Sequence, residues 1–100
     1  MKISIRRSGG FAGPLLAKSF AFETGDMPQA KARRLESLIA AVPSSALHGR
    51  RFHAKGGADL TKYEVEIQTP DGPARFFFDE SAVPEEFRSA WKALLELMEA

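Results

Sequence analysis

An alternating run in the second half of the chain constrains the fold more than any other feature. Between residues 62 and 68, apolar side chains alternate with charged or polar ones, and the apolar positions are Tyr63, Val65 and Ile67. This is the period of a β-strand with one buried face. Residues 69–72 read Thr-Pro-Asp-Gly, which places proline and glycine where a tight turn favours them. Residues 75–78 then supply a partner strand, so the sequence predicts a hairpin.

The returning strand contains three consecutive phenylalanines, Phe76 to Phe78. Successive side chains of a strand point to opposite faces, so this run puts apolar surface on both faces of a sheet. We therefore expect the strand to be central or covered on both sides. The run could instead form a strip that binds a partner, although burial in the core explains most of it.

A second hairpin is predicted at the start of the chain. Ile3 and Ile5 alternate with polar residues, and Phe20 and Phe22 share one face of the following run. The two runs are separated by a glycine-rich segment. We expect them to pair as a hairpin with a long loop.

The spacing of apolar residues predicts two helices. The first extends over about 27–41 and has an apolar stripe formed by Leu35, Leu38, Ile39 and Val42. The second begins near Pro84, a favourable first helical residue, and its stripe consists of Phe87, Trp91, Leu94, Leu95 and Met98.

The predicted order is strand, strand, helix, strand, strand, helix. This order favours an α+β fold, with a four-stranded antiparallel sheet and both helices packed on one face. The length of 100 residues is that of one ordinary domain, so residues 1–100 are expected to form a single domain.

Charge and composition exclude several functional classes. The chain has 14 basic and 13 acidic residues, a near balance that argues against a dedicated nucleic-acid or membrane-surface binder. It has no cysteine, so disulfides and thiolate chemistry are excluded. No stretch approaches the roughly 20 apolar residues of a membrane span, and the first residues are too charged for a secretion signal. We expect a cytoplasmic monomer, and release by another route is left open.

Residues 43–59 show no clear periodicity and are predicted to form a long loop. Leu47 and Phe52 are the residues that could anchor it. Three basic residues make it the most basic part of the chain: Arg50, Arg51 and Lys55. Its arginines and Phe52 could contact RNA, with Phe52 stacking on a base, so a nucleic-acid-associated or other protein-binding module using residues 48–55 is the alternative function.

Catalytic and metal-binding patterns are absent from the sequence. His48 and His53 are five residues apart and lack the spacing and carboxylate of a catalytic zinc motif on a helix, so solvated loop histidines explain them. A serine–histidine–acid site can assemble from distant residues, but no serine has the context of a nucleophile elbow. We therefore predict no enzyme activity and no cofactor.

The glycine-rich segment, residues 7–13, reads Arg-Ser-Gly-Gly-Phe-Ala-Gly. It differs from phosphate-binding loops because it leads to another strand rather than to a helix, and because no lysine followed by serine or threonine comes after its last glycine. A wide hairpin turn is the simplest explanation. A chain almost without side chains at Ser8, Gly9 and Gly10 could also enter a narrow cleft and offer its backbone.

The opening of the chain resembles the N-terminal signature of emfourin-like proteins, which are small bacterial inhibitors of thermolysin-like zinc metallopeptidases such as protealysin. The resemblance rests on Met-Lys-Ile at residues 1–3 followed by residues 7–13. It continues at Asp26-Met27-Pro28, at residues 62–65 and at residues 79–84, and it leaves the middle segment unmatched.

The resemblance implies a protein inhibitor whose partner is a thermolysin-like, protealysin-like metallopeptidase. It implies a peptidase-binding loop, which we assign to Arg7, Ser8, Gly9, Gly10, Phe11, Ala12 and Gly13. A secondary contact is assigned to Arg50, Arg51 and Phe52. Pro14-Leu15-Leu16 departs from the family pattern, where an aliphatic or charged run is common, and this departure bears on which peptidase is the target.

Overall fold

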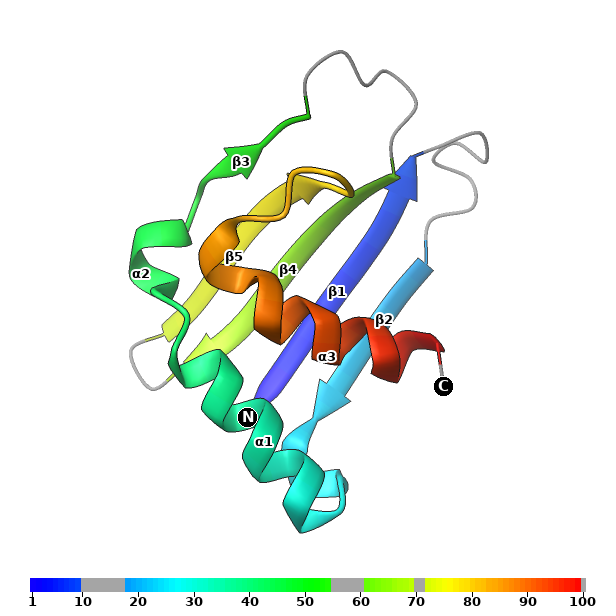
Figure 1. Ribbon diagram of the computed structural model, residues 1–100, viewed down its shortest axis with the longest axis vertical. Helices are drawn as coiled ribbons and strands as arrows, with labels where there is room; N and C mark the ends of the chain where they lie inside the picture. Colours follow the sequence, from blue (N-terminus) through cyan, green and yellow to red (C-terminus); the bar gives the residue numbers. More distant parts are fainter. Residues whose placement is uncertain (10–17, 55–60, 70–71, 100) are drawn as a thin grey trace.

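Five strands form one sheet in the part of the chain that the computed structural model describes, which is residues 1–9, 18–54, 61–69 and 72–99 (Figure 1). The order across the sheet is β2-β1-β4-β5-β3. The strands are β1 (Lys2–Gly9), β2 (Lys18–Glu23), β3 (Arg51–Phe52), β4 (Thr61–Thr69) and β5 (Gly72–Asp79).

Both predicted hairpins are confirmed. β1 is antiparallel to β2, and β4 is antiparallel to β5. β1 also pairs with β4, so the two hairpins join into one sheet with β1 and β4 at its centre. Gly72 begins β5 with a φ of 115°, a backbone angle that glycine adopts without steric cost.

Two longer helices, α1 (Gln29–Ala40) and α3 (Arg88–Glu99), pack on the same face of the sheet (Figure 1). The predicted first helix, 27–41, is longer than α1 by a few residues. The predicted second helix corresponds to a 3₁₀ turn at Glu85–Phe87 followed by α3. Another 3₁₀ turn, at Thr24–Asp26, precedes α1. The predicted stripes are buried as expected at Leu35, Ile39 and Val42 and at Phe87, Trp91 and Leu94.

The prediction of a four-stranded antiparallel sheet with two helices is wrong in the middle of the chain. Residues 43–54 form a short helix, α2 (Ser44–Leu47), and the strand β3, which runs parallel to β5 and makes the sheet mixed. Leu47 is buried, and backbone hydrogen bonds join the segment to β5, from Gly49 N to Arg75 O at 2.7 Å and from Phe77 N to Arg50 O at 3.0 Å. Because β3 has two residues, no alternation could reveal it.

An aromatic cluster fills the space between the sheet and α3. The ring of Trp91 lies 4.6 Å from that of Tyr63 and 4.9 Å from that of Phe78, both at steep angles typical of edge-to-face packing. Phe87 packs in the same way on Phe76, at 4.9 Å. The central position predicted for the phenylalanine strand is confirmed, because β5 lies between β4 and β3.

A buried carboxylate fixes the end of β3. Asp79 has 4% of its surface exposed, and its Oδ2 accepts a hydrogen bond from the backbone N–H of Ala54 at 2.8 Å. The Nδ1 atom of His53 lies 3.7 Å from the same oxygen. Asp79 therefore holds the chain after β3 against the end of β5.

The 3₁₀ turn before α1 is joined by hydrogen bonds both to α1 and to the start of the chain. The hydroxyl of the buried Thr24 donates to Glu36 Oε2 at 2.7 Å and accepts from the N-terminal ammonium of Met1 at 3.1 Å. The ammonium also donates to Glu23 Oε1 at 2.9 Å, and this hydrogen bond lowers the pKa of Glu23 below its usual value.

Because Trp91 lies at the centre of the aromatic cluster, its truncation should lower the stability of the protein most. We expect Trp91→Ala to lower the free energy of unfolding by about 3–5 kcal/mol, because it removes a large buried ring and leaves a cavity. Urea denaturation measures the loss. Lys92→Ala, at the exposed neighbouring position, is the control and should change stability by less than about 0.5 kcal/mol. Equal effects of the two substitutions would contradict this packing.

Replacing Asp79 should loosen β3 selectively. Asp79→Ala removes the acceptor of the Ala54 N–H, so we expect a loss of about 1–3 kcal/mol in stability and faster hydrogen exchange at the Phe77 amide, which bonds to Arg50. Asp79→Asn keeps an acceptor oxygen and should be milder. Glu80→Ala, at the exposed next residue, is the control. Unchanged exchange at Phe77 in Asp79→Ala would show that Asp79 does not fix β3.

Candidate functional site

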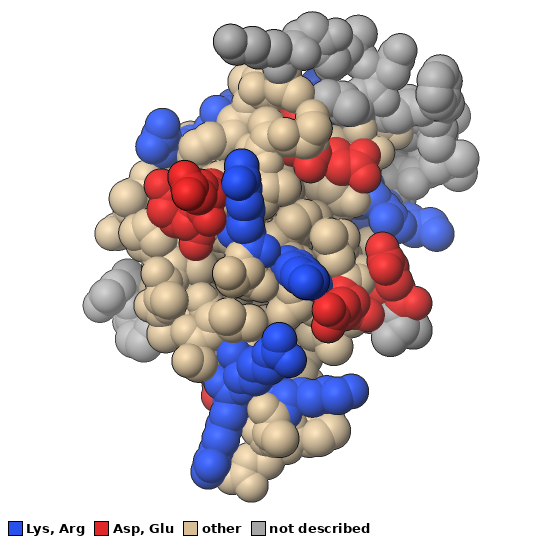
Figure 2. All heavy atoms as spheres, in the orientation of Figure 1, with Lys and Arg blue, Asp and Glu red and all other residues tan. Residues whose placement is uncertain are grey.

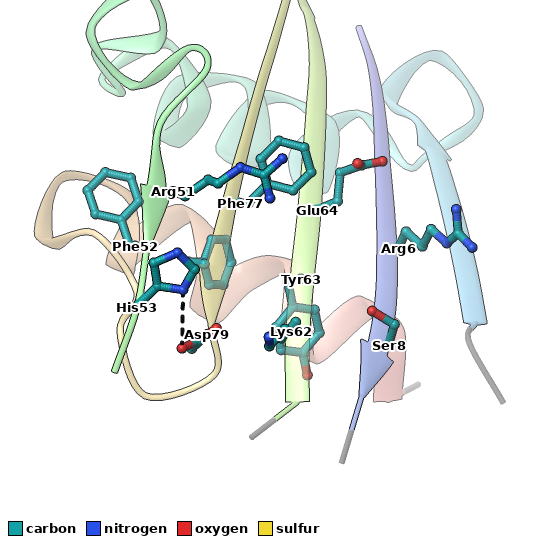
Figure 3. Close-up of a pocket in the computed structure, with 11 residues that line it drawn as sticks. Arg6, Ser8, Arg51, Phe52, His53, Lys62, Tyr63, Glu64, Phe77 and Asp79 are labelled. Carbon is teal, nitrogen blue, oxygen red and sulfur yellow. Dashed lines mark ion pairs between the residues drawn. The ribbon is translucent and has the colours of Figure 1, made fainter. Parts of the chain in front are cut away.

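The helices cover one face of the sheet, and we call the other the open face. No described helix or strand lies across it, and Figure 3 views it with the helices behind. The side chains on this face are exposed or half-buried apart from Asp79, and they include Ser4, Arg6, Ser8, Arg51, Lys62, Glu64, Glu66, Arg75 and Phe77. Most are polar, because successive side chains of a strand point to opposite faces and the apolar ones point to the buried face.

Strand register sets four of these side chains in one line across the sheet, which we call the cross-sheet row. Arg6 of β1 is opposite Glu64 of β4, Glu64 is opposite Phe77 of β5, and Phe77 is beside Arg51 of β3. The guanidinium carbon of Arg51 lies 4.2 Å from the centre of the Phe77 ring, a cation–π contact. In Figure 3 the Arg6 side chain points away from Glu64, toward β2.

A shallow groove lies along this row and the neighbouring one. It has a volume of about 250 Å³, and its lining includes the whole cross-sheet row together with Ser8, Lys62 and Asp79. Ser8 is opposite Lys62, and Lys62 is opposite Asp79, so these residues form the next line toward the end of the sheet. The groove therefore ends where β1 leads into the glycine-rich segment.

The groove has an excess of positive charge. Arg6, Arg51 and Lys62 make no ion pair with any carboxylate of the described residues, whereas Arg75 pairs with Glu66 at 3.3 Å. Glu64 is the acidic residue in the middle of the row, and the carboxylate of Asp79 already accepts from Ala54. An anionic group would find cations at both ends of the row and a half-buried aromatic ring between them.

The first three residues of the predicted peptidase-binding loop lie in β1. Arg7 is half-buried on the helix side, with its guanidinium carbon 5.3 Å from the centre of the Phe20 ring. Ser8 lines the groove on the open face. Gly9 ends the strand opposite Thr61, with a φ of 90° that favours glycine. The remaining predicted residues, Gly10, Phe11, Ala12 and Gly13, lie outside the described residues.

In the predicted secondary contact, Arg50 and Phe52 lie together, and Arg51 lies on the open face. Arg51 is exposed on the open face, over Phe77. Phe52 is half-buried against the core on the other face, and the guanidinium carbon of Arg50 lies 5.0 Å from the centre of its ring. The structure thus places the Arg51 side chain on the open face and Phe52 on the other, although both residues line the groove.

The two histidines have structural partners. Nδ1 of His48 accepts a hydrogen bond from the backbone N–H of Arg75 at 3.0 Å, and His53 lies beside Asp79. Within the described ranges, no group of three or more histidine, aspartate or glutamate side chains is placed to hold a metal ion. Nor does any helix among them have the length and apolarity to cross a membrane.

Sequence reasoning did not single out Arg6, Lys62 and Glu64 as a group. Each occupies a polar position of a strand in which apolar and polar residues alternate, and a charged residue is ordinary at such a position. The signal that unites them is the register between β1 and β4, which are more than fifty residues apart in the chain. Residue spacing along one strand cannot show that register.

Comparison with known proteins assigns the family. The family model for Emfourin matches residues 5–95, a range that begins within β1 and ends within α3. Comparisons with curated proteins and with solved structures give no further match. The match covers most of the chain and agrees with the resemblance at residues 7–13 and 79–84, and on this evidence the chain belongs to the Emfourin family.

Proposed function

We propose that this protein inhibits a thermolysin-like zinc metallopeptidase and that residues 7–13 occupy or block its active-site cleft. The observation that supports the proposal most directly is membership of the Emfourin family, which suggests a role as a metallopeptidase inhibitor rather than an enzyme. The peptidase class and the use of the loop go beyond that membership and form our hypothesis.

The position of the loop's first residues supports the mechanism. Arg7, Ser8 and Gly9 belong to β1, which is paired on one side with β2 and on the other with β4. A segment that leaves such a strand starts from a fixed point, so binding needs less ordering of the chain there. The pairing of Lys18 with Arg7 fixes the return of the segment in the same way.

The residue types in the segment suit an extended binding mode. Ser8, Gly9 and Gly10 offer backbone N–H and C=O groups with little side-chain bulk. A peptidase cleft that binds extended substrates could pair with such a backbone, while Phe11 or a neighbouring apolar side chain fills a specificity pocket. Inhibition would then come from occupation of the cleft, without any chemistry by this chain.

The alternative function, nucleic-acid binding through residues 48–55, has less support. The guanidinium of the exposed Arg50 lies over the ring of Phe52, which packs against the core, and Arg51 faces a groove that contains Glu64. A separate group of basic side chains lies on α1 (Figure 2), formed by the exposed Lys31, Arg33 and Arg34. Binding of a phosphate backbone favours one continuous basic surface, and these groups lie on different elements.

A bulky side chain at Gly10 should strongly weaken inhibition. We expect Gly10→Trp to weaken inhibition of a thermolysin-like peptidase by at least about 100-fold, because an indole side chain would prevent close approach of the backbone to the cleft. The measurement is the inhibition constant with a fluorogenic peptide substrate, across several purified peptidases of this class.

The matched control is Gln29→Trp, which adds the same side chain at an exposed position at the N-terminus of α1. Circular dichroism and thermal unfolding establish that both variants fold. Inhibition retained by Gly10→Trp would reject the cleft mechanism and leave the family assignment intact. No inhibition of any tested peptidase by the unaltered protein would reject the proposed function itself.

A further inference from the structure

We propose that the open face is a second binding surface, which takes an extended acidic segment of a partner protein with two carboxylates four residues apart. The surface is the groove along the cross-sheet row, Arg6, Glu64, Phe77 and Arg51 (Figure 3). This inference goes beyond the proposed inhibition, because it assigns a ligand to side chains that the glycine-rich segment does not contain.

The spacing of the two arginines defines the ligand. Arg6 and Arg51 stand on β1 and β3, which are separated by β4 and β5, so three strand spacings of about 4.8 Å, or about 14 Å, lie between them. In an extended chain, residues i and i+4 point to the same side and are about 13 Å apart. An extended segment that crosses the strands can therefore place one carboxylate at each arginine.

The charges of the row favour this arrangement. Arg6 and Arg51 have no carboxylate partner within the described part of the chain, so both guanidinium groups are available to an incoming anion. Lys62, in the adjacent line, adds a third cation. Glu64 lies between the arginines and would repel a negative group there, so the central residue of the segment should be neutral or basic.

The Arg51 end of the row is preorganised. Its guanidinium rests on the half-buried ring of Phe77 at 4.2 Å, and the chain after β3 is held by the hydrogen bond from Ala54 to Asp79. A side chain already held on an aromatic ring loses less freedom when it binds a carboxylate than a free surface arginine does. The ring also offers apolar contact to the segment's intervening residue.

The same charges disfavour nucleic acid as the ligand. A phosphate backbone has a negative charge at every nucleotide, and it would meet Glu64 within the row and Glu66 beside it on β4. A protein segment can place its carboxylates four residues apart and avoid these groups. Charge complementarity thus selects spaced carboxylates over a uniform polyanion.

The probe for the test is a capped, fluorescein-labelled dodecapeptide of serine and threonine with two glutamates four residues apart. Fluorescence anisotropy at low salt should give weak but saturable binding, and amide chemical shifts should change at Arg6, Glu64 and Phe77. Arg6→Gln with Arg51→Gln should weaken binding about tenfold, and Arg6→Gln alone, which leaves β3 untouched, about threefold. Raising the salt concentration to 0.5 M should weaken it similarly.

The matched control is Arg33→Gln with Arg34→Gln, which removes the same charge from exposed positions on α1 and should leave binding unchanged. A permuted peptide with adjacent glutamates should bind several-fold more weakly, and so should a single-stranded oligonucleotide. No binding of the spaced peptide would overturn the proposal. So would equal binding of the permuted peptide, tighter binding of the oligonucleotide, or no effect of the Arg6 and Arg51 substitutions. None of these outcomes bears on peptidase inhibition.

Discussion

The pairing of β1 with β4 is the constraint on which the rest of the structure depends. It sets Ile3 opposite Ile67 and Ile5 opposite Val65, and all four side chains are fully buried under the helices. A shift of β1 by one residue would turn Ile3 and Ile5 to the open face and Arg6 toward the core. The free energy of burying the apolar face therefore also fixes the register of the open face, where Arg6 is opposite Glu64 although neither side chain belongs to the core.

The two faces of the sheet follow from this register and have different roles. On the helix side, Trp91 and Phe87 bring aromatic packing to β4 and β5, and this packing accounts for the stability of a small domain without disulfides. On the open face, none of the described helices lies above Phe77, and Arg51 covers its ring in part. Strand β5 thus contributes Phe76 and Phe78 to the core and Phe77 to the groove on the open face.

How much could be predicted depended on whether a feature repeats along the chain. Alternation at the start of the chain and in residues 62–68 was enough to predict both hairpins. The apolar stripes from Leu35 to Val42 and from Phe87 to Met98 were long enough to predict both longer helices, and Leu47 was identified as a residue that could anchor the middle segment. The strand β3 was missed because two residues contain no period, and its pairing depends on backbone bonds to β5 and on Asp79. The cross-sheet row was missed because it exists only once strands from three separate parts of the chain, β1, β3 and the β4–β5 hairpin, are aligned.

The glycine-rich segment and the groove meet in β1, and the alternation of that strand keeps them distinct. Arg7 turns to the helix side and stacks on Phe20, Ser8 turns to the groove, and Gly9 ends the strand. A partner that reached the glycine-rich segment from the end of the sheet would leave the cross-sheet row free for another part of the same partner or for a second protein. The two surfaces can therefore be altered separately, by side chains that share a strand and do not touch.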